Sequence, residues 1–214
     1  MMIIISKDLR VKFGEIRDQG TRPTCLAFAT SDVHAASRSL PFVALSAEFL
    51  YFKAVHRSNP PDPNNGISVI AVSNALKLDG QPIEADWPYF PALPSNLAQW
   101  QPPTGLSVFR RTLSDKPKSI PVLIKAIDSG FPVLLCLRIS EAFYTPDVEG
   151  VVAFRRDDPD TGYHAMAAVG HGLLGTAPVI LIRNSWGANW GLDGHAWLHS
   201  RYVSARVHAV STIP

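Results

Sequence analysis

The chain has 214 residues, of which 46% are hydrophobic and 18% are charged, a composition typical of globular proteins and unlike that of disordered ones. The 20 basic and 18 acidic residues give a formal net charge of +2 and are scattered without runs. Neither a basic stripe with interleaved aromatic residues nor an apolar run of ~20 residues occurs, so we expect neither nucleic acid nor a membrane as a partner.

The first half of the chain predicts three helices, because its apolar residues recur at helical spacing. The first covers residues 25–40, with Thr24 as its N-cap and Cys25 in its first turn. The second covers about 46–56, with Ser46 as its cap, and the third about 67–78. A shorter helix is expected at about 120–129.

The second half is dominated by strand-like segments. These are short apolar runs separated by Gly, Pro and Asp, at residues 133–137, 151–154, 165–169, 179–183 and 196–199. Prolines cluster at 81–105 and predict irregular chain there. Helices followed by strands indicate an α+β fold in a single domain, residues 1–214, with a helical part at about 10–105 and a β-rich part at 106–214.

Three segments contain, in chain order, the residue types of a thiol-nucleophile acyl-transfer site. Cys25 opens the first predicted helix, whose positive end would lower the pKa of the thiol. His164 lies in an apolar, strand-like run, and Asn184 follows another. A histidine that takes the thiol proton and an amide that orients the imidazole complete such a site. The alternatives are His171 as the histidine, or a buried cysteine and a core histidine without a catalytic role.

The chain resembles the papain-like cysteine peptidases from about residue 8 to about residue 202. Asp8-Leu9-Arg10 is similar to the family's Asp-Trp-Arg opening, and Gln19-Gly20 with Cys25-x-Ala27-Phe28 is similar to its active-site segment. The segment Asn184-Ser185-Trp186-Gly187-x-x-Trp190-Gly191 resembles the family's most specific signature. The separation of Cys25 and His164 falls in the roughly 130–150 residues of the family. This resemblance implies a two-lobe fold, with a helical left lobe, a β-barrel-like right lobe and the active site in the cleft.

The resemblance also implies a cysteine endopeptidase that works through a thiolate–imidazolium pair and an acyl-enzyme, without a metal or organic cofactor. Cys25 is then the nucleophile, His164 the acid and base, and Asn184 the group that orients the imidazole. The amide of Gln19 and the Cys25 backbone N–H are expected to bind the developing oxyanion. Trp186 is expected to cover the hydrogen bond between histidine and asparagine, and also to be one of the substrate-binding residues.

A polypeptide substrate is implied, and its second residue before the cleaved bond is expected to enter an apolar pocket. The walls of this pocket are expected from Ile67, Ser68, Val133 and Ala165. Gly66 leaves bare backbone that could pair with an extended peptide, although an Asn-Gly turn is an equal alternative. The floor is expected at about 201–207, where Arg201 or Arg206 would add a preference for acidic side chains.

The cysteines and the first residues of the chain predict the cellular compartment of the protein. If Cys25 is the nucleophile, Cys136 has no partner for a disulfide within the chain, and Arg22 stands where the family has a bridged cysteine. With no signal-peptide pattern at residues 1–6, we expect a bacterial cytoplasm, or a host cytoplasm reached without a classical signal peptide.

We expect no inhibitory pro-segment, so a protein inhibitor or regulator is a candidate partner. His195 and His199, four residues apart, are not expected to bind a metal.

Two other functions stay open at this point. An acyltransferase, deamidase or transpeptidase would use the same Cys-His-Asn site with another acceptor. A pseudoenzyme would only bind a peptide in the cleft. The sequence does not indicate the oligomeric state.

Overall fold

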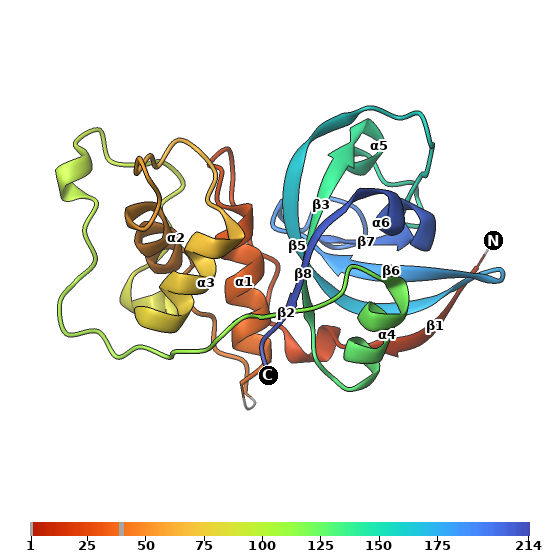
Figure 1. Cartoon of the computed structure of the whole chain (residues 1–214), viewed down its shortest axis with the longest axis horizontal. Helices are drawn as coiled ribbons and strands as arrows, with labels where there is room; N and C mark the ends of the chain where they lie inside the picture. The colour runs from red at the N-terminus through yellow and green to blue at the C-terminus, as the bar shows by residue number, and fades with distance from the viewer. Residues whose placement is uncertain (1, 39–40) are drawn as a thin grey trace.

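In the computed structural model, which describes residues 2–38 and 41–214, three helices lie on one side of the molecule and a large sheet on the other (Figure 1). The three are α1 (Cys25–Ala36), α2 (Ala47–His56) and α3 (Val69–Leu78). The sheet side carries α4 (Ile120–Asp128), α5 (Glu141–Tyr144) and α6 (Ser200–Arg206). Short 3-10 turns occur at Arg10–Lys12, Glu84–Asp86 and Leu97–Gln99.

The described part of the chain forms a sheet of eight strands. Their bounds are β1 (Ile3–Asp8), β2 (Ser114–Asp115), β3 (Val133–Ser140), β4 (Val151–Val152), β5 (Asp160–Leu174), β6 (Ala177–Arg183), β7 (His195–His199) and β8 (Val207–Thr212). The order is β2-β8-β3-β5-β6-β7-β4, with β1 also paired to β5, and only the β4–β7 pairing is parallel. The predicted α+β class is confirmed, but the sheet is open and does not close into the barrel-like form that we expected.

The predicted elements appear with altered limits. α1 ends at Ala36, short of the predicted residue 40, and residues 39–40 lie outside the described part of the chain. Thr24 holds the N-cap position of α1 without capping it, because its hydroxyl is hydrogen-bonded to that of Tyr89 instead. Ser46 does cap α2, since its hydroxyl accepts from the Phe49 backbone N–H at 3.0 Å. The strands β1, β2 and β8 were not predicted.

Alternate residues of β5 enter two different cores, which explains why this strand is apolar on both faces. Met166 and Ala168 pack in the core beneath α4 and α6. Ala165 and Ala167 pack on the opposite face, together with residues of α1 such as Leu26 and Ala29. Small alanine side chains let α1 lie close to β5, so the start of α1 and the middle of β5 face each other.

The helices of the described residues are all too short or too polar to cross a membrane. The pairing of β1 with β5 attaches the first residues of the chain to the β-rich part. The division at about residue 105 stays a prediction.

Candidate active site

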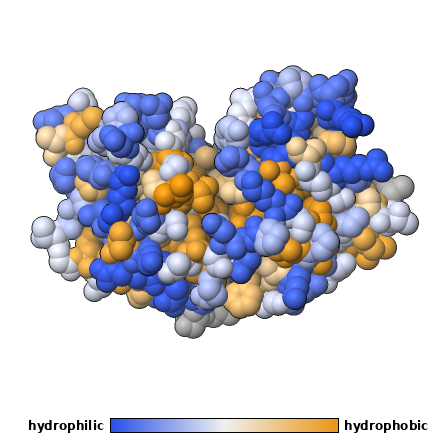
Figure 2. All heavy atoms as spheres, viewed as in Figure 1, coloured by the Kyte–Doolittle hydropathy of each residue, from blue (hydrophilic) through white to orange (hydrophobic). Residues whose placement is uncertain are grey.

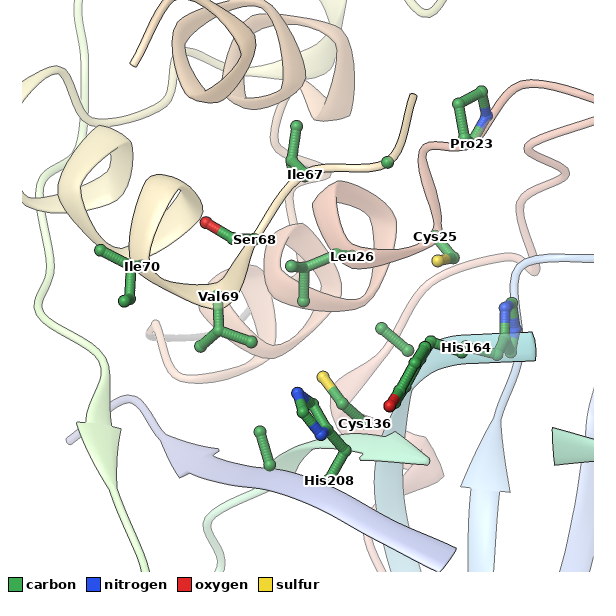
Figure 3. A pocket seen from close by; sticks show the side chains of 14 residues that line it. Pro23, Cys25, Leu26, Ile67, Ser68, Val69, Ile70, Cys136, His164 and His208 are labelled. Carbon is green, nitrogen blue, oxygen red and sulfur yellow. The ribbon is translucent and has the colours of Figure 1, made fainter. Parts of the chain in front are cut away.

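A pocket of about 540 Å³ lies between the start of α1 and the middle of β5. Figure 2 shows hydrophobic residues gathered in the hollow between the two halves of the molecule, and Figure 3 shows the pocket from close by. It is lined by Pro23, Cys25, Leu26, Gly66, Ile67, Ser68, Val69, Ile70, Cys136, Tyr163, His164, Ala165, His208 and Ala209. Cys25 and His164, predicted from segments far apart in the sequence, therefore meet at one pocket.

Cys25 is the first residue of α1 and is half-buried, with its side chain on the pocket side of the helix (Figure 3). Burial raises the pKa of the Cys25 thiol, and hydrogen bonds from the backbone N–H groups of Ala165 and Leu26 oppose this rise. The net direction is opposite to the lowered pKa expected from the helix end. Thus the protein environment alone does not stabilise a lone thiolate.

His164 is buried on β5 and is oriented by Asn184. The His164 Nε2 and the Asn184 Oδ1 are 2.6 Å apart, and the same oxygen accepts from the Ser185 backbone N–H at 2.9 Å. An amide oxygen only accepts, so Nε2 carries the proton of the neutral ring and Nδ1 is free to take another. Burial lowers the pKa of His164 to about 4, although the hydrogen bond with Asn184 acts in the opposite direction.

The two shifts together define the charge state of the site. Burial disfavours a thiolate on Cys25 with a neutral His164, and equally an imidazolium on His164 with a neutral Cys25. Transfer of the thiol proton to the imidazole adds no net charge to the site. The two charges are therefore expected to appear together, as a pair that titrates as a unit.

Aromatic rings pack on the ring of His164, whose Nε2 contacts Asn184. The Trp186 ring lies with its centroid 4.6 Å from that of His164, and Tyr144 stacks on Trp186 at 5.3 Å. Phe143 approaches His164 edge-on at 5.7 Å. Rings packed in this way exclude water from the part of the imidazole that they contact. The sequence pointed to Trp186 but not to Phe143 or Tyr144, because the one-turn helix α5 that carries them has no periodic pattern.

Gln19 is buried beside the segment that contains Asn184. Its Oε1 accepts from the Ser185 hydroxyl at 2.7 Å, and its backbone N–H donates to the Ser185 carbonyl at 2.9 Å. Its Nε2 donates to the carbonyl of Arg22 at 2.9 Å. An amide nitrogen carries two hydrogens, so one of them is left for a further acceptor.

The pocket has a floor of small residues from three neighbouring strands. Cys136 of β3 pairs with Ala165 of β5 on one side and with Ala209 of β8 on the other. Directly paired residues point to the same face of a sheet, so this row leaves a hollow. Val133, expected in the wall, is fully buried in the other core, and Cys136 lines the pocket instead.

The other expected pocket residues divide into two groups. Gly66, Ile67, Ser68 and Ala165 line the pocket as expected. Trp186 does not line it and packs on His164. Arg201 and Arg206 are absent from the floor as well, where His208 and Ala209 lie; Arg206 instead pairs with Asp160.

Of the other histidines, His208 lines the pocket, whereas His171, His195 and His199 make their contacts elsewhere. His171 faces away from the pocket, and its Nε2 lies 2.8 Å from Asp128 Oδ1. His195 Nδ1 lies 2.8 Å from the Asp193 carbonyl, and His199 caps α6. Residues 2–38 and 41–214 contain no group of three or more His, Cys, Asp or Glu side chains that could hold a metal ion.

Alkylation at neutral pH is expected to modify Cys25 far faster than Cys136. Burial, and to a smaller extent the nearby Cys25, raise the pKa of Cys136 to about 12, so its thiolate is scarce at pH 7. Cys25 is less buried and lines the same pocket as His164, the expected acceptor of its proton. Mass mapping after brief iodoacetamide treatment measures both rates, and both thiols are free in the structure. Equal labelling, or preferential labelling of Cys136, would contradict this prediction.

Comparison with known proteins decides the family. The sequence profile described as papain family cysteine protease matches residues 5–212. The chain belongs to this family. It is 27% identical over 210 residues to an uncharacterised peptidase C1-like protein of Acanthamoeba polyphaga mimivirus, an alignment that covers 87% of this chain and 65% of the viral protein. It is 24% identical over 187 residues to bovine pro-cathepsin H, covering 84% of this chain and 54% of that protein.

Solved structures agree with the fold. Xylellain, a cysteine protease from Xylella fastidiosa, superimposes with a TM-score of 0.79 at 22% identity, covering 97% of this chain and 84% of the other. This likeness shows the papain-like fold. The chain spans about 65% and 54% of the two full-length relatives above, so the activity of those proteins does not transfer to it directly.

Proposed function

We propose that the chain is a cysteine endopeptidase that hydrolyses peptide bonds through an acyl-enzyme on Cys25. The observation that carries this proposal is the contact of His164 with Asn184, at the end of a pocket that also holds Cys25. Family membership supports the same chemistry. A thiol, an oriented imidazole and an amide are the groups that acyl transfer by a cysteine requires.

In the proposed reaction, His164 Nδ1 takes the proton of Cys25 while the sulfur attacks the peptide carbonyl. The imidazolium then gives this proton to the leaving amine, and water, deprotonated by His164, releases the acid product. Asn184 accepts the Nε2–H bond throughout and keeps Nδ1 on the side of the thiol. The free hydrogen of the Gln19 amide and the Cys25 backbone N–H bind the oxyanion.

A peptidyl epoxide that alkylates active-site thiols tests the nucleophile. We expect one label per chain, mapped to Cys25, and loss of peptide cleavage in step with labelling. Cleavage that persists after full labelling of Cys25 would contradict the proposal. Repeating cleavage with an added amine detects transfer, because an acyltransferase or transpeptidase would form the amide product instead of the acid.

Substrate selection is expected to depend on the second residue before the cleaved bond, with a preference for Leu, Val or Phe. The pocket is walled largely by apolar side chains such as Leu26, Ile67 and Val69, and burying an apolar residue there contributes about 1.5–3 kcal/mol. A positional-scanning peptide library measures the preference. A profile dominated by Lys or Arg, or indifferent to this position, would rule out this role for the pocket.

A matched pair of variants links that preference to the pocket floor. Ala209→Leu fills part of the hollow and is expected to shift the preference from Leu and Phe to smaller side chains. Ala205→Leu adds the same atoms at an exposed position of α6 outside this pocket and is expected to leave the profile unchanged.

A further inference from the structure

Arg22 is a buried arginine in the loop that carries Gln19. Only 7% of it is exposed, and its guanidinium meets Glu48 of α2, which is fully buried. Nη1 donates to Glu48 Oε2 at 2.6 Å and Nη2 to Glu48 Oε1 at 3.0 Å. Two parallel hydrogen bonds between a planar guanidinium and a carboxylate fix direction as well as distance.

The surroundings of this pair supply further partners for both charges. Arg22 Nη1 also donates to the Phe90 carbonyl at 2.6 Å, and Glu48 accepts from Trp100 Nε1 at 2.6 Å and from the Phe90 backbone N–H at 3.2 Å. The guanidinium carbon lies 5.0 Å from the Tyr89 ring centroid and 5.4 Å from that of Tyr51. The Arg22 Nε has no hydrogen-bond partner among the described residues, so the two Nη atoms and the aromatic faces hold the guanidinium.

The backbone of Arg22 is attached to the proposed oxyanion donor. The Arg22 carbonyl accepts from Gln19 Nε2 at 2.9 Å and from the Thr24 backbone N–H at 2.8 Å. The Tyr89 hydroxyl donates to the Gln19 carbonyl at 2.7 Å. Between these contacts Gly20 and Thr21 are exposed, and Gly20 has a φ of 58°. The loop is thus anchored inward mainly through Gln19 and Arg22.

We propose that Arg22 and Glu48 form a non-covalent brace that positions the Gln19 amide for the oxyanion. This inference rests on the proposed peptidase function. One hydrogen of Gln19 Nε2 is held by the Arg22 carbonyl, which directs the other away from it. Arg22 and Glu48 lie outside the pocket, and both cysteines are free, so the brace acts at a distance and without a disulfide. Arg22 and Glu48 are positioning residues.

The test compares reactions that do and do not use the oxyanion site. In Arg22→Met, kcat for peptide cleavage is expected to fall about 10–100-fold with a smaller change in KM. The inhibition constant of a peptide aldehyde should rise in parallel, because Cys25 adds to its carbonyl carbon and the oxygen then occupies the oxyanion position. Alkylation of Cys25 by iodoacetamide forms no oxyanion and should stay within about threefold of wild type.

Controls separate positioning from loss of structure. Arg206→Met removes another buried arginine, paired with Asp160 in the β-rich part, and is expected to leave kcat unchanged. Glu48→Gln keeps the shape and the Trp100 contact, and is expected to give a milder form of the Arg22→Met pattern. Equal loss of cleavage, aldehyde binding and alkylation would indicate a merely structural role and overturn the proposal, as would an unchanged kcat.

Amide hydrogen exchange tests the Arg22–Glu48 brace independently of any activity measurement. In the Cys25→Ala background, Glu48→Gln is expected to speed exchange of the Thr24 N–H, which is bonded to the Arg22 carbonyl. Unchanged exchange there would overturn the brace even in an active enzyme. If the wild type cleaves no peptide but this exchange does speed up, the brace stands and the proposed function fails.

Discussion

Cys25→Ala is expected to lower peptide cleavage by at least ~10⁴-fold and to leave the fold nearly unchanged. The substitution removes a single sulfur atom from a half-buried residue at the edge of the core, so little packing is lost. His164→Ala is expected to be comparably inactive, because it removes the imidazole that is proposed to take the thiol proton. Initial rates of cleavage under reducing conditions, with thermal unfolding as the check on folding, measure both effects.

Two further variants sharpen this prediction. Asn184→Ala should retain more activity than Cys25→Ala or His164→Ala, because it removes orientation and not a reacting atom. The double variant Cys25→Ala/His164→Ala should be no worse than either single variant, since residues that act as a unit are not additive. Equal activity of Cys25→Ala and wild type would end the peptidase proposal.

Acidification from pH 7 to pH 4.5 is expected to lower the free energy of unfolding by several kcal/mol. Burial lowers the pKa of three histidines, His34, His164 and His195, from 6.5 to about 4 in the folded protein. Below pH 6.5 the unfolded chain therefore binds protons that the folded protein does not. The free energy of unfolding therefore falls as the pH decreases from 6.5 toward 4. By about pH 4, each of these imidazoles has lowered it by roughly 2–3 kcal/mol.

Urea unfolding of Cys25→Ala at several pH values measures this slope without self-cleavage. His34→Asn is the informative variant, because an amide can keep the hydrogen bond that His34 Nδ1 makes with Gln81 Oε1 at 2.8 Å but takes up no proton. Between pH 6.5 and 4.5, the free energy of unfolding of His34→Asn should depend less steeply on pH than that of Cys25→Ala alone. The difference should equal the contribution of one imidazole. Burial raises the pKa of Glu84, so protonation of this carboxyl increases the free energy of unfolding as the pH falls and partly offsets the histidines. A pH-independent free energy of unfolding would contradict the prediction.

The pocket shows where sequence patterns were insufficient. Val133 and Cys136 belong to the same apolar strand, and one of them had to face Ala165. Side chains alternate along a strand, so the answer depends on the register between β3 and β5, which pairs Cys136 with Ala165. The floor was misplaced for a similar reason: β8 begins at Val207, so His208 and Ala209 reach the pocket while Arg206 remains in α6.

The sequence by itself determined the family and the α+β class of this protein, through the order of Cys25, His164 and Asn184, the Trp-Gly signature after the asparagine, and a pattern of helices followed by strands. These features are local, and residue type and spacing reveal them. Only the tertiary structure decided the open sheet, the pocket floor, the aromatic cover from α5 and the Arg22–Glu48 pair. Each of these depends on contacts between segments distant in the chain, which register and packing select and no local pattern encodes.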